Sequence, residues 1–480
     1  MNALTKIMPW PADPTDLLGL ALWDAVAIAR ATGGVAVGEF QVSGVEIDSR
    51  DVVPGDLFFA LKGEAMDGHK FVEMAFARGA AAVVVDRPVE GPHVLVNDTN
   101  AALIKLAKAA RARVDATIVG VTGSVGKTGV KEAIFAALDR SSRGGAHRSI
   151  KSYNNHVGVP LSLSRMPRET EFGVFEMGMN HTGELAALTQ FVRPNVAIVT
   201  TIAPAHIEHF GSEDRIADAK AEIFEGLEPG GVAIIPADSP HYARLRGHAE
   251  KFASRIVSFG FSESADVRCI DHLAIANGGS LITAKLPGAM LQYELSQPGD
   301  HWVANSLAVL AAVQAVGADL AVAGLALADM GGLKGRGARH RIAVSGGEAL
   351  LIDESYNANP ASMTATLAGL GNATADRRIA VLGAMKELGE QSAKFHTALR
   401  EPIESAQVDW LLLVGEEMAP LAEALSADIA WADKFAHCAS VAEASQRLRS
   451  EVRGGDAILI KGSNSVGLSA VVEALLGGGD

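Results

Sequence analysis

The sequence predicts an α/β protein of three domains: a small N-terminal α/β domain over residues 1–108, a central domain with a phosphate-binding loop and a mainly parallel sheet over 109–338, and a C-terminal doubly wound, Rossmann-like domain over 339–480. Three observations lead to this prediction. A chain of 480 residues is too long for one hydrophobic core. Residues 118–138 have the pattern of a strand, a glycine-bearing turn and a helix. Short apolar runs alternate with helical patterns on either side of residue 339, as in parallel sheets covered by helices.

The N-terminal domain is predicted from short apolar runs and two polar loops. A helix is expected over Thr15–Ala31, because apolar residues recur there at helical spacing and two glycines end the pattern. The loops 48–50 and 63–69 follow strands and carry polar groups of the kind that bind ligands. For Asp48 and Arg50 a solvated ion pair is the simpler explanation. The expected strands are Val42–Ile47, Asp56–Ala60, Ala82–Val85 and Val94–Val96.

The loop at residues 122–128, TGSVGKT, is the feature around which the rest of the chain is organised. Gly123 and Gly126 allow the backbone to approach phosphate oxygens, and the N–H groups of the loop and of the following helix attract anions. Lys127 can reach the β- and γ-phosphates, and the Thr128 hydroxyl can ligand Mg²⁺. The spacing is the shorter GxxGK[ST], so a glycine-rich turn that binds nothing is the alternative. The strand, the Lys-Thr pair and the helix together favour a nucleotide site formed by Gly123, Ser124, Val125, Gly126, Lys127 and Thr128.

Further polar residues follow strands of the same predicted sheet. Glu176 ends the apolar run 172–175 and His206 follows the run 196–201, so both are expected at the sheet edge that holds the glycine loop. Glu176 is favoured as a Mg²⁺ ligand over a helix-capping acid, whereas His206 is explained equally well as an ordinary loop histidine. Lys220 lies in a helical pattern, and the residues alone favour a solvated lysine.

Two more candidates lie towards the end of the central domain. Asn305 precedes Ala-rich helices, and its amide can hydrogen-bond an adenine edge. The glycine- and arginine-rich segment 334–341 is interpreted as a domain boundary, in which Arg336 is either part of a basic linker or a clamp for a γ-phosphate. Beyond it, strands are expected at Ala349–Ile352, Ile379–Leu382, Trp410–Val414 and Ala457–Ile460.

Composition narrows the classes of function. The net charge of −14 argues against nonspecific binding of nucleic acid, which needs a basic surface. Cys269 and Cys438 have no metal-binding spacing and suit a reducing cytoplasm. The N-terminus has no secretory pattern, and the Ala-rich stretch 307–328 is better explained by two packed helices with a turn near Gly317 than by a membrane span. We therefore expect a cytoplasmic protein without stable membrane insertion.

The motifs together resemble the ATP-dependent Mur ligases of peptidoglycan synthesis, and the resemblance covers nearly the whole chain. It is strongest to the members that add D-alanyl-D-alanine. The matching segments are IDSRDVVPGDLFFALKGEAMDGHKF at 47–71, TGSVGKT at 122–128, SYNNHVGVPLSL at 152–163, FEMGMNHTGEL at 175–185, AHIEHFGS at 205–212, AKAEIF at 219–224, GDHWVAN at 299–305, DESYNANPASM at 353–363, LGAMKELGE at 382–390 and KGSNSVG at 461–467.

The resemblance implies an activity, its substrates and its cofactors. ATP phosphorylates the carboxylate of UDP-N-acetylmuramoyl-tripeptide, and the amine of D-alanyl-D-alanine attacks the acyl phosphate. Mg²⁺ is implied as the metal, and we expect a monomer because relatives are mostly monomeric. The N-terminal domain is implied to hold the UDP end, the central domain ATP, and the C-terminal domain the dipeptide.

The resemblance also implies roles for particular residues. Lys127, Lys220 and His206 are implied as catalytic, with Lys220 carbamylated, which reverses the interpretation from the residues alone. Thr128, Glu176 and His206 are implied as metal ligands, and Asn305, Arg336 and Glu354 as further ATP contacts. The implied substrate contacts are Ser49, Arg50, His69, Asn154, Asn155, Tyr356 and Asn359.

The sequence departs from the family pattern at three positions, and three other functions are alternatives to the predicted one. Ala384 and Glu354 stand where Asp is common, and Asn464 replaces the usual Arg of KGSRS, which makes substrate engagement by the C-terminal domain the least secure part. A sister ligase that adds diaminopimelate or lysine is the nearest alternative, and those that add diaminopimelate usually carry DNPR, which is absent from this sequence. Folylpolyglutamate synthase lacks the N-terminal domain, and a GTPase switch would need an NKxD motif, which the sequence also lacks.

Overall fold

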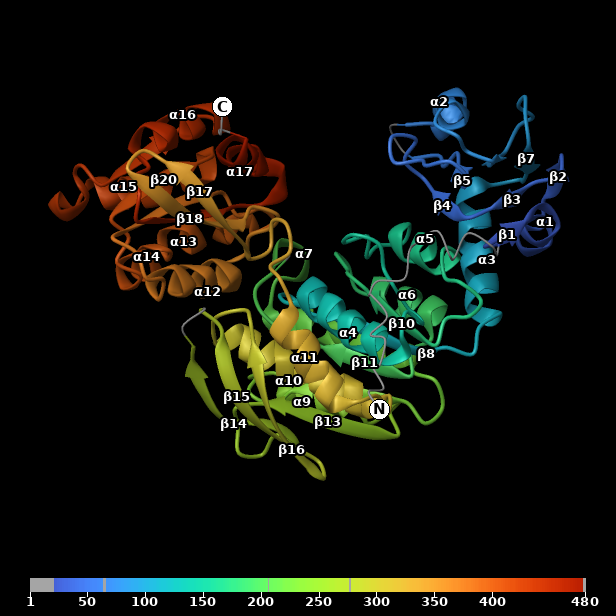
Figure 1. Ribbon diagram of the computed structural model, residues 1–480, viewed down its shortest axis with the longest axis horizontal. Helices are drawn as coiled ribbons and strands as arrows, with labels where there is room; N and C mark the ends of the chain where they lie inside the picture. The colour runs from blue at the N-terminus through green and yellow to red at the C-terminus, as the bar shows by residue number, and fades with distance from the viewer. Residues whose placement is uncertain (1–20, 64–65, 206, 276–277, 478–480) are drawn as a thin grey trace, which may run out of the picture. The chain divides into compact units, whose positions relative to one another are not determined.

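The computed structural model describes residues 21–63, 66–205, 207–275 and 278–477 (Figure 1). The chain forms two compact units. The first consists of residues 1–116 and 147–175, and the second of residues 117–146 and 176–480.

A five-stranded sheet in the order β2-β7-β6-β5-β4 forms the centre of the first unit. Strands β4 to β7 run parallel to one another, and β2 is antiparallel to β7. Because the strands are parallel, the loops after β4, β5 and β6 emerge at one edge of the sheet. The elements are β1 (Trp23–Asp24), α1 (Ala25–Thr32), β2 (Val35–Val37), β3 (Gln41–Val42), β4 (Gly44–Glu46), β5 (Asp56–Phe59), η2 (Gly68–Phe71), α2 (Val72–Ala77), β6 (Ala82–Val85), β7 (His93–Leu95), α3 (Thr99–Ala112), β9 (Ala146–Arg148), α5 (Gly158–Ser164) and β10 (Phe172–Glu176).

The predicted helix over Thr15–Ala31 is confirmed from Ala25 onward and is wrong over the described residues 21–24. Residues 15–20 lie outside the described residues, and the helix α1 begins only at Ala25. The Asp24 carboxylate accepts a hydrogen bond from Ala27 N at 2.7 Å, which caps the helix, and Trp23 pairs with Val42 in the short β1–β3 ladder. Capping and strand pairing therefore override the helical spacing of the preceding residues.

The sheet at the centre of the second unit has nine strands in the order β16-β15-β14-β13-β12-β11-β8-β10-β9, and its last two strands are the β10 and β9 already given with the first unit. Strands β8, β11, β12, β13 and β14 are parallel, and β15 and β16 are added antiparallel. Helices α4, α10 and α11 lie together beside this sheet (Figure 1). The elements are β8 (Thr117–Thr122), α4 (Lys127–Ser142), α6 (Glu184–Val192), β11 (Val196–Val199), α7 (Ile207–Phe210), α8 (Glu213–Ala221), η3 (Glu222–Gly226), β12 (Val232–Pro236), α9 (Tyr242–Ala249), β13 (Arg255–Gly260), β14 (Val267–Ala274), β15 (Ser280–Leu286), β16 (Ala289–Leu295), α10 (Asp300–Ala315) and α11 (Leu320–Asp329).

The C-terminal part of the second unit has its own sheet in the order β17-β18-β22-β19-β20-β21. Only β17 is antiparallel, so the arrangement is the predicted doubly wound one with an added edge strand. The elements are β17 (Ala338–Val344), β18 (Gly347–Glu354), α12 (Pro360–Gly371), β19 (Arg377–Gly383), η4 (Gly389–Gln391), α13 (Ser392–Thr397), α14 (Arg400–Ser405), β20 (Trp410–Val414), η5 (Glu416–Met418), α15 (Ala419–Ser426), η6 (Ile429–Trp431), β21 (Phe435–Cys438), α16 (Val441–Glu451), β22 (Asp456–Lys461), η7 (Asn464–Val466) and α17 (Ser469–Leu476).

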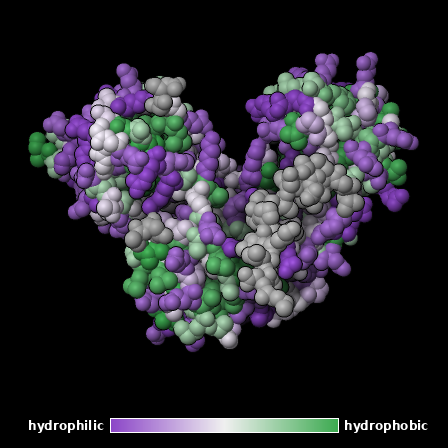
Figure 2. Space-filling view, in the orientation of Figure 1, coloured by the Kyte–Doolittle hydropathy of each residue, from purple (hydrophilic) through white to green (hydrophobic). Residues whose placement is uncertain are grey.

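The Ala-rich stretch 307–328 forms parts of two helices, as predicted. Helix α10 ends at Ala315, Gly317 adopts a left-handed φ of 75°, and α11 begins at Leu320. Within the described residues, every helix is too short or too polar to cross a membrane. On the face seen in Figure 2, hydrophobic residues are interspersed with hydrophilic ones.

Candidate active site

The glycine loop joins β8 to α4 as predicted. Gly123 has a φ of 150° and Gly126 a φ of 87°, and residues with a side chain rarely adopt either value. The space beside both glycines is filled: a Cβ on Gly123 would lie 1.9 Å from Thr200 Oγ1, and one on Gly126 would lie 2.8 Å from Asn305 Oδ1. The loop therefore needs glycine for its conformation and for its packing.

Residues 200–203, which follow β11, hold the glycine loop through hydrogen bonds. Thr200 Oγ1 donates to Val125 O at 2.6 Å, and Ser124 Oγ donates to Ala203 O at 2.9 Å. The backbone of the loop is bonded to the same segment, because Ser124 N donates to Thr201 O at 2.7 Å. Thr200 was missed in the sequence, because a threonine at the end of an apolar strand carries no distinctive signal.

Thr128 and Glu176 meet at the start of α4. Thr128 Oγ1 donates to Glu176 Oε2 at 2.8 Å, and both side chains are buried. Glu176 is the last residue of β10, and the next residue, Met177, donates its N–H to Val121 O of β8 at 2.8 Å. The sequence prediction that Glu176 lies beside the glycine loop is confirmed in its geometry. Two hard oxygen donors at this point suit Mg²⁺.

Two lysines approach the same place. Lys127 Nζ donates to Gly123 O at 2.8 Å, and removal of its ammonium from water lowers its pKa. Lys220 of α8 is 2% exposed, and burial lowers its pKa well below the usual value, with the charge of Lys127 adding to the effect. Among the residues that the structure describes, none forms a hydrogen bond or ion pair with the Lys220 ammonium. The expectation of a solvated lysine from the residues alone is therefore wrong.

Asn305 and Arg336 also lie at this site. Asn305 is buried in α10 against Gly126 of the loop. Arg336 stacks its guanidinium on the ring of Tyr356, with 4.3 Å between its Cζ and the ring centroid. Its charge lowers the pKa of Lys127, which places Arg336 within electrostatic range of the loop. The structure thus brings together five of the predicted positions, Lys127, Thr128, Glu176, Asn305 and Arg336.

The end of β18 holds a second polar cluster. Lys461 is buried, and its Nζ contacts Glu354 Oε2 at 3.4 Å and Asn357 O at 3.0 Å. Burial lowers the pKa of Lys461, while Glu354 opposes this change. Asp353, which the sequence did not single out, accepts bonds from Gly335 N at 2.8 Å and Ser355 Oγ at 2.6 Å. These contacts fix the segment that carries Arg336 and Tyr356.

Asn359 caps helix α12 in the structure. Its side chain accepts a bond from Ser362 N at 2.9 Å, and Ser362 Oγ accepts one from Asn359 N at 3.0 Å. This reciprocal capping box explains the residue structurally. Its predicted contact with substrate stays a prediction.

In the first unit, Ser49 and Arg50 follow β4 at the carboxyl edge of the sheet. Ser49 is buried, with its Oγ 3.4 Å from Met74 Sδ, and Arg50 is exposed. Arg50 forms the expected ion pair with Asp48 at 2.6 Å, and this bond lowers the pKa of Asp48 to about 2.

The paired asparagines lie in the same unit. Asn155 Oδ1 accepts bonds from Gly158 N at 2.9 Å and Val157 N at 3.2 Å, which fixes the start of α5. Lys151, three residues before Asn154, forms an ion pair with Asp51 at 2.7 Å. The Asn154–Asn155 segment therefore lies beside the loop that carries Ser49 and Arg50.

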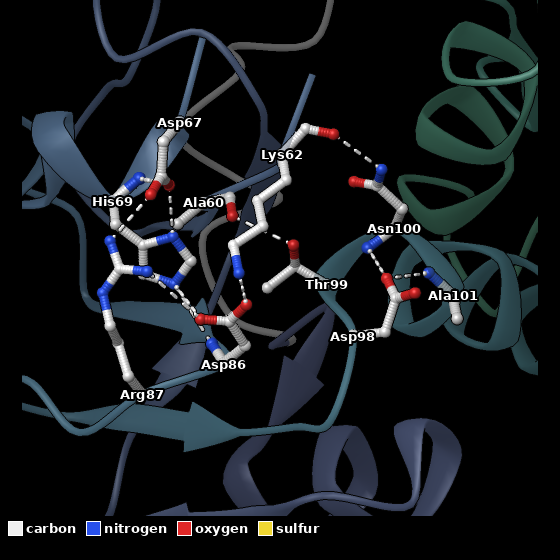
Figure 3. A network of polar contacts seen from close by, with 10 residues as sticks. All are labelled: Ala60, Lys62, Asp67, His69, Asp86, Arg87, Asp98, Thr99, Asn100 and Ala101. Carbon is white, nitrogen blue, oxygen red and sulfur yellow. Dashed lines mark hydrogen bonds and ion pairs between the residues drawn. The ribbon is translucent and has the colours of Figure 1, made fainter. Parts of the chain in front are cut away.

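His69 is placed differently from a residue that contacts substrate. Its side chain is 3% exposed, and both ring nitrogens are in use. Nδ1 lies 2.7 Å from Asp67 Oδ1, and Nε2 lies 3.1 Å from Asp86 N (Figure 3). The ring is enclosed in a polar network of this unit.

His206 lies outside the described residues. Within the described part of the chain, no group of three or more His, Cys, Asp or Glu residues is arranged to hold a metal ion. Thr128 and Glu176 are thus the two predicted metal ligands whose positions the structure gives.

The fold and the site define a phosphate-loop α/β protein with a separate N-terminal unit and a doubly wound C-terminal sheet. Three family models match it: "Mur ligase family, catalytic domain" at residues 41–116, "Mur ligase middle domain" at 121–313 and "Mur ligase, glutamate ligase domain" at 340–464. The chain belongs to the Mur ligase family, and it is therefore a ligase. The predicted three-domain α/β fold is confirmed.

Characterised relatives agree over nearly the whole length. The UDP-N-acetylmuramoyl-tripeptide--D-alanyl-D-alanine ligase of Synechocystis sp. is 37% identical over 91% of this chain and 93% of its own. The crystal structure of MurF from Acinetobacter baumannii is 30% identical with a TM-score of 0.81, over 95% of this chain and 99% of its own. The structure of MurF ligase from Thermotoga maritima in complex with ADP is 27% identical with a TM-score of 0.74, over 90% and 97%. These names match the predicted dipeptide-adding members rather than a ligase for diaminopimelate or lysine.

Proposed function

We propose that this ligase joins D-alanyl-D-alanine to UDP-N-acetylmuramoyl-tripeptide and hydrolyses ATP to ADP and phosphate in doing so. The structural observation that supports it best is the buried Thr128–Glu176 pair under a glycine loop that also holds Lys127 and Asn305. The names of the relatives support the substrates.

The chemistry is an activation followed by a transfer. A tripeptide carboxylate oxygen attacks the γ-phosphorus of ATP, the bond to ADP breaks, and an acyl phosphate forms. The amine of D-alanyl-D-alanine then attacks the carbonyl carbon, loses a proton, and expels phosphate as the amide forms. Enzymes promote such phosphoryl transfers mainly by positioning and charge neutralisation.

Each part of the site has a task in this scheme. Lys127 and the loop N–H groups neutralise the β- and γ-phosphates, and Arg336, held on Tyr356, completes the clamp. The Asn305 amide beside Gly126 contacts the adenine end, and Glu354 is proposed to contact ATP through its place at the end of β18. Of the substrate contacts, Ser49, Arg50, Asn154 and Asn155 hold the UDP-muramoyl peptide, and Tyr356 and Asn359 lie where the dipeptide arrives.

Mg²⁺ fits the oxygen donors of this site. Thr128 Oγ1 and Glu176 Oε2 would hold it, together with His206, and when bound it would neutralise phosphate charge. Glu176 would thereby supply a carboxylate that is already oriented by its bond to Thr128.

Lys220 is proposed to be carbamylated. A neutral amine attacks CO₂ to give a carbamate and a proton, and burial lowers the pKa of Lys220, which favours the neutral amine. The product is a carboxylate-like group on a side chain that has no described partner of its own.

We also propose a division of the substrates among three segments. Residues 1–108 hold the UDP end, residues 109–338 hold ATP, and residues 339–480 receive the dipeptide. We also propose a cytoplasmic monomer. Cys269 and Cys438 are buried and free, which suits a reducing compartment.

Phosphate release that depends on both substrates tests the function. We expect release only when ATP, a UDP-muramoyl-tripeptide and D-alanyl-D-alanine are all present, because the acyl phosphate needs a carboxylate and its consumption needs an amine. A coupled phosphate assay with diaminopimelate- and lysine-containing tripeptides measures this and also shows which third residue is used. Equal release with ATP alone would instead indicate a switch or transport ATPase.

A further inference from the structure

The polar network around His69 has an inner acidic layer and an outer basic layer (Figure 3). The His69 side chain is 3% exposed, and the side chains of Asp86 and Asp67 are 13% and 31% exposed. The cations lie outermost: Lys62 is 52% exposed and Arg87 50%. The charges that face solvent are therefore positive, although the four ionic groups sum to zero.

His69 joins the two carboxylates of this network. Its Nδ1 lies 2.7 Å from Asp67 Oδ1, and its Nε2 lies 3.1 Å from both Asp86 N and Asp86 Oδ1. Asp67 and Asp86 in turn each hold a cation: Arg87 Nη2 donates to Asp67 Oδ2 at 2.8 Å, and Lys62 Nζ pairs with Asp86. The ring has no nitrogen left for a ligand, so it acts only through these neighbours.

The backbone on which Lys62 sits is fixed as well. Asn100 Nδ2 donates to Lys62 O at 2.8 Å, and Thr99 Oγ1 donates to Ala60 O at 3.0 Å (Figure 3). Both residues belong to the first turn of α3, which Asp98 caps. Lys62 follows β5 and Arg87 follows β6, so both lie at the sheet edge where Ser49 and Arg50 follow β4.

Both acids of the network stay ionised. The hydrogen bond from Arg87 lowers the pKa of Asp67, and the bond from Lys62 lowers that of Asp86. Neither cation is saturated by its acid, because an ammonium has three donors and a guanidinium five. An exposed ion pair rearranges at little cost when a stronger anion arrives.

We propose that Lys62 and Arg87 bind the diphosphate of the nucleotide-linked substrate, and that His69 is a positioning residue which sets both cations through Asp86 and Asp67. The proposal rests on the proposed function, in which this unit holds the UDP end. It replaces the earlier expectation that His69 contacts the substrate. A diphosphate is the anion that fits, because two oriented cations present separate donors to adjacent phosphate groups.

Replacement of His69 by phenylalanine tests the positioning role. The ring volume is kept while both polar contacts are lost. We expect the Kd for UDP and the KM for UDP-muramoyl-tripeptide to rise about tenfold, as for partial loss of charged hydrogen bonds, with kcat changed less than about twofold. Titration of the purified full chain with UDP gives the first value and steady-state kinetics the others. His69→Gln, whose amide keeps polar contact with the acids, is expected to recover part of the loss.

A double-mutant comparison separates positioning from a general structural effect. Lys62→Met with Arg87→Gln should raise the Kd for UDP by at least about tenfold, and adding His69→Phe to that pair should then change it less than about twofold. His93→Phe is the matched control. His93 is a buried histidine in β7 of the same sheet, bonded through Nδ1 to Gly91 O at 2.8 Å, and its replacement should leave the Kd for UDP within about twofold.

The outcomes distinguish this inference from the proposed function. A normal Kd and KM in His69→Phe, or an undiminished tenfold effect in the Lys62→Met, Arg87→Gln background, would overturn the inference while leaving the ligase activity intact. A wild-type chain that neither binds UDP nor uses UDP-muramoyl-tripeptide would overturn the proposed function, and the inference with it.

Discussion

Lys127→Ala is expected to lower kcat/KM for ATP-dependent ligation by at least about a hundredfold. The ammonium of Lys127 lies on the glycine loop, 2.8 Å from Gly123 O, and in the proposed function it would neutralise charge that grows on the transferred phosphoryl group. Loss of one such preorganised charge costs about 3–4 kcal/mol of transition-state stabilisation. The coupled phosphate assay with both substrates present measures the loss.

A second lysine variant and a charge control make this result interpretable. Lys127→Met keeps the bulk of the side chain and should be equally inactive if charge is what matters. Arg140→Gln removes a cation from the other end of the same helix, where Arg140 forms an exposed pair with Asp329 at 2.8 Å. This control should stay within about twofold of the wild type. Near-normal turnover in Lys127→Ala would contradict the nucleotide assignment.

Lys220→Met is expected to lower kcat for ligation by at least about a hundredfold. It is not expected to lower the melting temperature. The proposed carbamate cannot form on methionine, so the carboxylate that it would supply is lost and activity falls. The folded state, by contrast, no longer buries an amine that lacks a described partner, so stability is kept or raised. Activity assays and thermal unfolding of the same preparation measure the two effects.

Lys131 provides the matched comparison for stability. It is also fully buried, in α4, but its Nζ pairs with Glu132 at 2.9 Å. Lys131→Met leaves an acid without this partner and should destabilise the fold by about 1–3 kcal/mol. Carbon-13-labelled bicarbonate should give a carbamate signal in the wild type that Lys220→Met lacks. A large loss of stability in Lys220→Met, with no such signal in the wild type, would show that Lys220 has a structural role only.

The fold was largely predictable because its signals are local. The strand–loop–helix pattern at 118–138, the strands Ala82–Val85 and Trp410–Val414, and the turn at Gly317 were all predicted from short stretches of sequence. The antiparallel strands β15 and β16 were missed, since hairpin pairing in a mixed sheet depends on neighbours distant in the chain. The start of α1 was misplaced because Trp23 is held by pairing with Val42.

A site residue could be predicted only where its side-chain chemistry suited a ligand and its position at the end of a strand placed it at the edge of the sheet. Glu176 could be placed beside the glycine loop because it ends a strand of the same sheet. Lys220 could not, because a lysine in a polar helix has the pattern of a solvated residue, and only tertiary packing buries it. The resemblance implied that His69 contacts the substrate, but the contacts of its ring with Asp67 and Asp86 depend on residues up to 17 positions away and could not be predicted from the motif.

The transfer of an oxygen atom from substrate to phosphate tests the central claim most directly. The tripeptide carboxylate is labelled with oxygen-18, and the phosphate released in a complete reaction is analysed by mass spectrometry. An acyl phosphate mechanism predicts one labelled oxygen from the carboxylate in each phosphate released, and unlabelled ADP. Phosphate without label, or label in AMP, would contradict the account of this chain as a ligase that activates its substrate by phosphoryl transfer at Lys127 and Glu176.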